Sequence, residues 1–230
     1  MSAIADNLQA IRDRIARAAC AVGRKPSDIS LLAVSKTKPL SDIEMAIAAG
    51  QTAFGENYVQ EGVDKCRSLA VDRGIEWHFI GPLQSNKSRS VAEHFDWVHT
   101  VDRLKIAERL SAQRPASLPP IQVCVQVNIS GEASKSGCSP ETASELCHAV
   151  AALPGLQLRG LMAIPEASDD LQQQREPLRR LRELFEQIRD SGLALDTLSM
   201  GMSHDLEAAI AEGATIVRVG TAIFGERNYS

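Results

Sequence analysis

The residues of this chain that could do chemistry lie mostly where short apolar runs end. Lys36 follows the run LLAVS, and Arg218 lies inside the run IVRVG. A lysine at the edge of an apolar core loses hydration, and a nearby cation such as Lys38 adds repulsion, which favours the neutral amine that attacks a carbonyl carbon. From position alone, a solvated lysine at a strand end is the commoner case.

Two glycine-containing words near the end of the chain have the chemistry of an anion site. Ser199, Met200 and Gly201 form one, and Gly220 with Thr221 forms the other. Glycine lets main-chain N–H groups approach an anion closely, and the two hydroxyls add donors. The alternative is that these glycines only make tight turns. Their place after the last two apolar runs favours a phosphate site, because α/β barrels bind phosphate after strands seven and eight.

Arg218 and the histidines are further candidates for a ligand-binding, metal-binding or catalytic role. A buried arginine needs a carboxylate partner or a ligand. The five histidines form no H-x-x-x-H pair, so we expect no zinc site. His78 is more often a satisfied core histidine than a catalytic one. No nucleotide-binding glycine motif or serine-hydrolase motif is present in the sequence.

The elements that must position these residues alternate along the chain. Residues 3–22 have the helical spacing of apolar residues, and 171–190 are charged and leucine-rich. Ser41 and Glu44 fit a capping box that opens a helix closed by Gly50. Ser139 with Pro140 predicts an N-cap followed by proline at the first helical position. Eight β-rich runs are predicted at 29–35, 52–55, 76–80, 97–101, 121–129, 157–162, 197–200 and 216–220.

This alternation predicts a parallel sheet, and eight units within 230 residues favour a closed (β/α)8 TIM barrel with an extra N-terminal helix. No linker divides the chain, so we expect a single domain over residues 1–230. The active end of such a barrel is the carboxyl end of its strands, where Lys36, Asn57, Met162 and Arg218 would meet.

Composition excludes several classes of protein. Lys and Arg total 25 and Asp and Glu 29, a net charge of −4 that argues against a general nucleic-acid binder. The five cysteines include no C-x-x-C pair, which favours free thiols in a reducing compartment. The N-terminal segment carries charges among its apolar residues, unlike a signal peptide or a membrane span. We therefore expect a cytoplasmic protein.

Seven words of the sequence resemble one known family. They are AVSKTKP (33–39), FGENYVQE (54–61), WHFIGPLQSNK (77–87), VNISGEASKSG (127–137), GLMAIP (160–165), LSMGMSHDLEAAI (198–210) and VRVGTAIFG (217–225). They resemble, in order and over nearly the whole chain, the pyridoxal phosphate homeostasis proteins, the YggS-type PLP-binding proteins. That family is similar in turn to the N-terminal barrel of alanine racemase and to fungal D-threonine aldolase.

The resemblance implies pyridoxal 5′-phosphate (PLP) held as a Schiff base on Lys36, in a protein of vitamin B6 homeostasis. It sets Arg218 against the pyridine nitrogen, where a guanidinium would keep that nitrogen unprotonated and weaken the ring as an electron sink. The family commonly has an acidic residue where this chain has His204, at a position we expect beyond the ligand contacts. The other implied residues are Ser199, Gly220 and Thr221 at the phosphate, Asn57 and Met162 on the pocket wall, and Lys38 and Lys135 as accessory lysines.

Three functions remain open at this stage. The first is a monomeric binding protein that limits free PLP and passes it to apoenzymes. The second is an amino-acid racemase or aldolase, but a racemase needs two acid/base groups. In the alanine racemase architecture the second is a tyrosine of a partner subunit's extra domain, and the tyrosines here are Tyr58 and Tyr229 only. The third is a sugar-phosphate enzyme without PLP. We favour the first.

Overall fold

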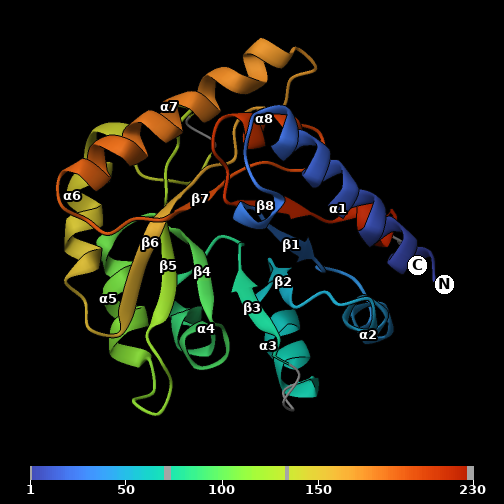
Figure 1. Cartoon of the computed structure of the whole chain (residues 1–230). Coiled ribbons are helices and arrows are strands. Elements are labelled where there is room, and N and C mark those ends of the chain that lie inside the picture. Colours follow the sequence, from blue (N-terminus) through green and yellow to red (C-terminus); the bar gives the residue numbers. More distant parts are fainter. Residues whose placement is uncertain (1, 70–73, 133–134, 227–230) are drawn as a thin grey trace.

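The computed structural model describes residues 2–69, 74–132 and 135–226, and within them eight parallel strands close into a barrel (Figure 1). Each strand pairs with the next along the chain, and β1 closes the ring on β8 through the pairs from Ser30 with Ile216 to Ala33 with Val219. The strands are β1 (Ser30–Val34), β2 (Ala53–Glu56), β3 (Glu76–Phe79), β4 (Trp97–Val101), β5 (Ile121–Gln126), β6 (Leu156–Met162), β7 (Thr197–Ser199) and β8 (Ile216–Val219).

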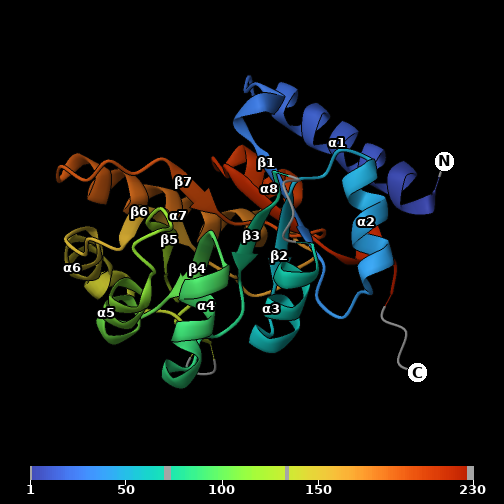
Figure 2. The same cartoon turned by 90° about the horizontal axis from the view of Figure 1, so that it is seen from below.

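Helices connect successive strands, and Figure 2 shows α2 to α6 following one another around the outside of the strands. Two short 3-10 turns are present: η1 (Pro26–Asp28) joins α1 to β1, and η2 (Ser85–Lys87) precedes α4 in the connection from β3 to β4. Parallel neighbouring strands require such crossover connections, which are almost always right-handed. The helices are α1 (Ala3–Ala21), α2 (Leu40–Ala48), α3 (Val59–Ser68), α4 (Ser88–His94), α5 (Leu104–Gln113), α6 (Pro140–Ala151), α7 (Leu171–Asp190), α8 (Leu206–Ala211) and α9 (Thr221–Phe224).

The predicted barrel and its extra N-terminal helix are confirmed. Strand centres agree with the prediction, and every strand end lies within one residue of it except the end of β5, which is three residues earlier than predicted. The apolar pattern marks the middle of a strand better than the residue where pairing stops. One capping prediction is wrong. Helix α2 begins at Leu40 after the N-cap Pro39, so Ser41 lies inside the helix and forms no capping box. Ser139 and Pro140 do stand at the predicted N-cap and first helical positions of α6.

Side chains alternate between the two faces of each strand, so the barrel has one apolar region outside it and another inside it. The outward-facing residues pack under the helices in one large core. The inward-facing residues fill the barrel, and the apolar ones among them are Leu32, Ile80, Trp97, Cys124, Met162 and Ile216. The apolar side chains inside the barrel therefore form a second, smaller core.

Helix α1 is the element outside the eightfold repeat. It packs its apolar stripe, including the fully buried Leu8, against the barrel's outer layer. Asn7 donates to the carbonyl of Ile223 in α9 over 2.9 Å, and Arg14 pairs with Glu207 in α8. The helix thus covers the seam where β8 meets β1, and Figure 1 shows it lying alongside α8.

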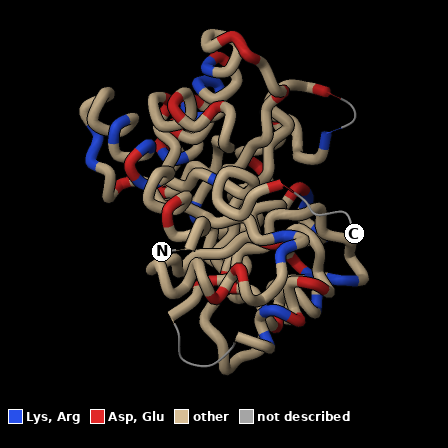
Figure 3. The backbone as a smooth tube through the Cα atoms, turned by 90° about the vertical axis from the view of Figure 1, so that its right-hand side faces the viewer, with Lys and Arg blue, Asp and Glu red and all other residues tan. Residues whose placement is uncertain are grey.

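Charge is mixed over the described part of the chain, and Figure 3 shows Lys and Arg interspersed with Asp and Glu on several segments. Within the same residues no helix is long and apolar enough to cross a membrane, and no group of three His, Cys, Asp or Glu side chains could hold a metal ion. The charge distribution agrees with the sequence argument against a nucleic-acid surface.

Candidate functional site

A cavity of about 350 Å³ opens at the carboxyl ends of the strands, the end where barrel enzymes and binding proteins hold their ligands. Its volume lies at the lower end of the usual range for small-molecule sites. Its lining combines apolar side chains with amine, guanidinium, amide and hydroxyl groups. The lining residues are Val34, Lys36, Asn57, Ile80, Ile164, Met202, Ser203, His204, Arg218, Gly220 and Thr221.

Lys36 follows β1 and is half-buried at the cavity. The next residue, Thr37, has a φ of 64°, which is unusual for a β-branched residue and marks a strained turn. The Thr37 amide donates to Glu61 Oε1 over 2.6 Å, a charge-assisted hydrogen bond that holds this turn. The backbone that presents Lys36 is therefore fixed from outside the cavity.

A buried ionic cluster beneath this turn supplies the rest of that support. Lys65 of α3 is 5 % exposed and donates to the Ser35 carbonyl, to Glu56 and to Glu61 over 2.6–2.8 Å. The Ser35 hydroxyl also donates to Glu56 over 2.6 Å. Burial raises the pKa of the Glu56 carboxyl, and the Lys65 ammonium opposes that rise. This cluster was not predicted from the sequence, although the lysine four residues after Glu61 is a visible signal of an ion pair on one helix face.

Arg218 on β8 is 5 % exposed and lines the same cavity. It donates to the carbonyl and hydroxyl oxygens of Ser199, both over 2.7 Å, and to the carbonyl of Ala163 over 2.9 Å. None of these acceptors is charged, and no ion pair joins Arg218 to another described residue. Burial lowers the pKa of the guanidinium to about 10, which leaves it a cation at neutral pH.

Ser199 does not face the cavity as the sequence analysis expected. Alternation along β7 turns Leu198 outward into the core under the helices and Ser199 inward, where it is fully buried. Its hydroxyl lies 2.7 Å from Nδ1 of His99 and accepts from Arg218. Because these two partners occupy the hydroxyl, the geometry does not support its assignment to a phosphate.

The other predicted residues fall into two groups. Five of the predicted residues line the same cavity: Lys36, Asn57, Arg218, Gly220 and Thr221. The Asn57 carbonyl oxygen Oδ1 is buried and has no hydrogen-bond partner among the described residues. The remaining three lie beneath or beside the cavity: Met162 inside the barrel, Met200 in the outer core and Gly201, with φ +94°, in the turn after β7.

The accessory lysines have structural partners. Lys38 donates to the carbonyls of Phe224, Gly225 and Glu226 over 2.8–3.1 Å, which fastens the end of α9 to the turn after β1. Lys135 pairs with Glu132 over 2.6 Å within its own loop. Neither lines the cavity, whereas His204, expected beyond the ligand contacts, does.

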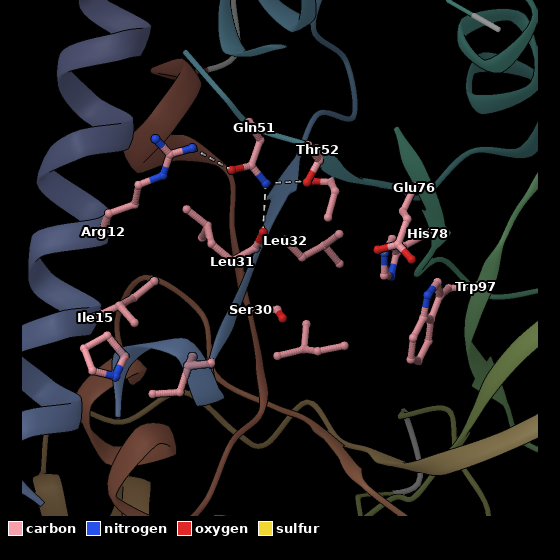
Figure 4. Close-up of a pocket in the computed structure, with 14 residues that line it drawn as sticks. Arg12, Ile15, Ser30, Leu31, Leu32, Gln51, Thr52, Glu76, His78 and Trp97 are labelled. Atoms are coloured by element: carbon pink, nitrogen blue, oxygen red, sulfur yellow. Dashed lines mark hydrogen bonds and ion pairs between the residues drawn. The ribbon is translucent and has the colours of Figure 1, made fainter. Parts of the chain in front are cut away.

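A second cavity of about 420 Å³ opens at the opposite, amino ends of the strands (Figure 4). Arg12 of α1 lies on one side of it and donates to Gln51, while Glu76, His78 and Trp97 lie together on the other. This cavity lacks a lysine, and its cation and its polar amide are already paired with each other. The cavity that contains Lys36 is therefore the better candidate for carbonyl chemistry.

The cavity at the carboxyl ends has the groups that PLP requires. A primary amine for its aldehyde comes from Lys36, and a donor for a pyridine nitrogen comes from Arg218. The unpartnered Asn57 oxygen can accept a hydrogen bond from a ligand. Hydroxyls of Ser203 and Thr221 and the turn at Gly220 can meet a phosphate without a neighbouring lysine. The residues present fit the cofactor.

Comparison with known proteins agrees with this interpretation. The family model described as "Alanine racemase, N-terminal domain" matches residues 2–228. A "Pyridoxal phosphate homeostasis protein" of Pseudomonas aeruginosa is 61 % identical over 229 residues, covering 100 % of this chain and 98 % of the relative. The protein of the same name from Escherichia coli K12 is 60 % identical over 233 residues, covering 100 % and 99 %.

The chain belongs to the pyridoxal phosphate homeostasis protein family. Among solved structures, PipY of Synechococcus elongatus with PLP bound is 36 % identical with a TM-score of 0.84, covering 96 % of this chain and all of that one. Alanine racemase of Corynebacterium glutamicum has a TM-score of 0.73 at 18 % identity. It shares the barrel fold, but this chain covers only 61 % of its length.

Proposed function

We propose that this protein binds PLP through Lys36 and acts in PLP homeostasis. The observation that carries the proposal is that Lys36 and Arg218, distant in sequence, line one cavity at the carboxyl ends of the strands. The names of its relatives and the PLP-bound PipY structure support the same function.

The covalent link follows from amine chemistry. When PLP is bound, the Lys36 amine would supply the nitrogen for a C=N bond to its aldehyde carbon, with release of one water. Arg218 donates to the ring nitrogen and, because a guanidinium has no proton to give up at neutral pH, keeps that nitrogen unprotonated. A ring with an unprotonated nitrogen withdraws electrons weakly, which favours binding of the cofactor over catalysis with it.

The phosphate end is proposed at Gly220 and Thr221, with Ser203 beside them. Hydroxyl and main-chain donors give a phosphate directed hydrogen bonds, each contributing roughly 1.5–3 kcal/mol. This revises the sequence-based assignment in one residue, since Ser203 lines the cavity and the Ser199 hydroxyl is bound within the barrel.

Borohydride reduction of the PLP-loaded protein tests the proposal. Reduction followed by peptide mapping is expected to give a pyridoxyl group on Lys36, and Lys36→Ala is expected to abolish the visible absorption of the bound cofactor. Lys38→Ala is the matched control, since the Lys38 amine is held by three carbonyls. Label mainly on Lys38 or Lys135, or no colour with excess PLP, would contradict the assignment.

We further propose that binding is not accompanied by significant turnover. A racemase needs a second acid/base group opposite Lys36. Tyr58 is exposed and does not line the cavity, and Tyr229 lies outside the described residues, which leaves His204 as the titratable candidate. The loaded protein is expected to exchange the α-proton of L-alanine with deuterated water far more slowly than the ~1–10³ per second usual for enzymes.

Exchange in the enzymatic range that His204→Gln removes would make the protein an enzyme. Three finer expectations accompany this proposal: a monomer, a cytoplasmic location and transfer of PLP to apoenzymes. Mixing the loaded protein with a PLP-free aminotransferase and following activity would test transfer directly.

A further inference from the structure

A chain of polar side chains runs through the barrel from one end to the other. Arg218 at the candidate site donates to the Ser199 hydroxyl over 2.7 Å, and that hydroxyl lies 2.7 Å from Nδ1 of His99. Nε2 of His99 lies 2.9 Å from Nδ1 of His78. At the far end, Nε2 of His78 faces a carboxylate oxygen of Glu76 at 3.9 Å.

The chain crosses four strands, and its inner members are sealed from water. Ser199 and His99 are fully buried, and His78 is 3 % exposed. The imidazole of His78 stacks on Trp97, with centroids 5.2 Å apart and planes within 9° of each other, which fixes its orientation. Figure 4 shows Glu76 and Trp97 beside His78 at the second cavity, the end of the chain opposite the candidate site.

Hydrogen-bond chemistry gives this chain one direction. The Ser199 oxygen already accepts from Arg218, so its single proton is available for His99 Nδ1. A neutral His99 that accepts at Nδ1 carries its proton on Nε2 and donates to His78. His78 then also carries its proton on Nε2, which points it at the Glu76 carboxylate.

The opposite direction is disfavoured by the charge at the Glu76 end. If His78 donated to His99 and His99 to Ser199, the serine proton would have no acceptor among the described contacts. The lone pair of His78 Nε2 would also face the Glu76 carboxylate. In the proposed direction the proton on Nε2 of His78 also has no hydrogen-bond partner among the described residues, because Glu76 lies 3.9 Å away. Each direction therefore leaves one buried proton without an acceptor, at a cost of about 1–3 kcal/mol, and the attraction between the His78 N–H and the carboxylate favours the proposed one.

We propose that Ser199, His99 and His78 are positioning residues for Arg218, with both imidazoles neutral and protonated on Nε2. The serine proton given to His99 makes the serine oxygen a better acceptor, because hydrogen bonds in a chain polarise one another. Arg218 is thereby held at a fixed place in the wall of the cavity without a carboxylate that would neutralise it. Its effect on a bound pyridine ring rests on the proposed function.

The proton positions can be measured without any ligand. Long-range ¹H–¹⁵N correlation spectra of the apoprotein with ¹⁵N-labelled histidine are expected to show two Nε2–H imidazoles that stay neutral from pH 7.5 to 5.5. His94 and His148 are internal references of the other tautomer in their neutral form, since each bonds a backbone carbonyl through Nδ1. Nδ1–H or doubly protonated rings for His78 and His99 would overturn the proposal.

Variants of Ser199 connect the chain to the cofactor. Ser199→Ala removes both the acceptor for Arg218 and the donor to His99, and is expected to weaken PLP and unphosphorylated pyridoxal alike by ~10-fold. Ser199→Thr keeps the hydroxyl and is expected to restore both affinities and the Nε2–H signal of His99.

The outcomes separate this inference from the proposed function. If the parent protein binds no PLP, the proposed function fails while the tautomers still test the chain. If the parent binds PLP and Ser199→Ala leaves both affinities and the His99 signal unchanged, the positioning role is wrong. Weakening confined to PLP would return Ser199 to the phosphate and would also contradict it.

Discussion

At the scale of single residues, the candidate site is defined by a buried cation that keeps its charge. Arg218 is surrounded by neutral oxygen acceptors, whose dipoles stabilise the guanidinium without neutralising its charge. A ligand with an acceptor atom can therefore gain a charge-assisted hydrogen bond in the cavity. Lys36, by contrast, is half-buried and sits where a carbonyl compound can enter.

Thr221 gives a prediction at this scale. Thr221→Val removes a hydroxyl at the cavity while keeping the side-chain shape, so it is expected to weaken PLP about 10- to 100-fold. Unphosphorylated pyridoxal is expected to lose little affinity, because it has no phosphate to bind. Fluorescence or absorbance titration with both ligands measures this, and Thr221→Ser is the matched control. Equal losses for the two ligands would refute a phosphate contact at Thr221.

At the scale of elements, the turn after β1 depends on a neighbouring helix. Its strained Thr37 is held by Glu61, and its Ser35 carbonyl by Lys65, both from α3. The turn that presents Lys36 is therefore only as stable as the packing of α3 beside β1. A lysine on a turn that is held in this way can keep one position with and without a ligand.

Lys65→Met tests that dependence. Removing the buried ammonium leaves Glu56 and Glu61 without their shared partner, and such a loss is expected to lower the free energy of unfolding by about 3–5 kcal/mol. Urea denaturation followed by circular dichroism measures the change. Lys87→Met is the control, because Lys87 is exposed and forms no ion pair in the described part of the chain. A change below about 1 kcal/mol for Lys65→Met would show that the cluster is dispensable.

At the scale of the whole molecule, the barrel interior makes stability depend on pH. Burial lowers the pKa values of His78 and His99 from the ordinary 6.5, that of His99 strongly, and the neighbouring imidazole and Arg218 lower the latter further. The unfolded chain takes up protons on both rings as pH falls through 6.5, whereas the folded protein takes them up only at lower pH, above all on His99. Acid therefore favours the unfolded chain.

Urea titrations between pH 7.5 and 5.5 are expected to show unfolding free energy falling as pH falls. The two rings together can contribute at most about 2.7 kcal/mol per pH unit to the slope, which is twice the value for one group. Glu56 and Asp96, whose buried carboxyls have raised pKa values, act in the opposite sense at the acid end of their range. Stability that stays constant or rises on acidification over this interval would contradict the prediction.

The sequence by itself determined the fold and brought Lys36 and Arg218 to the centre of the candidate site. Apolar runs alternating with helical segments require parallel strands, and a run such as LLAVS must end with Lys36 at the mouth of whatever closed sheet forms. The position of Arg218 inside an apolar run showed that it would be buried. These features depend on periodicity along the chain, which a single sequence displays directly.

Only the tertiary structure decided which polar groups meet. Ser199 was predicted at a phosphate because it ends a strand, but the phase of a three-residue strand turns it inward to Arg218 and His99. The pairing of His78 with His99, and of Lys65 with Glu56, joins residues on different elements. Such contacts depend on the register between strands and on barrel closure, which are set by packing of the whole core and leave no periodic signal in the sequence.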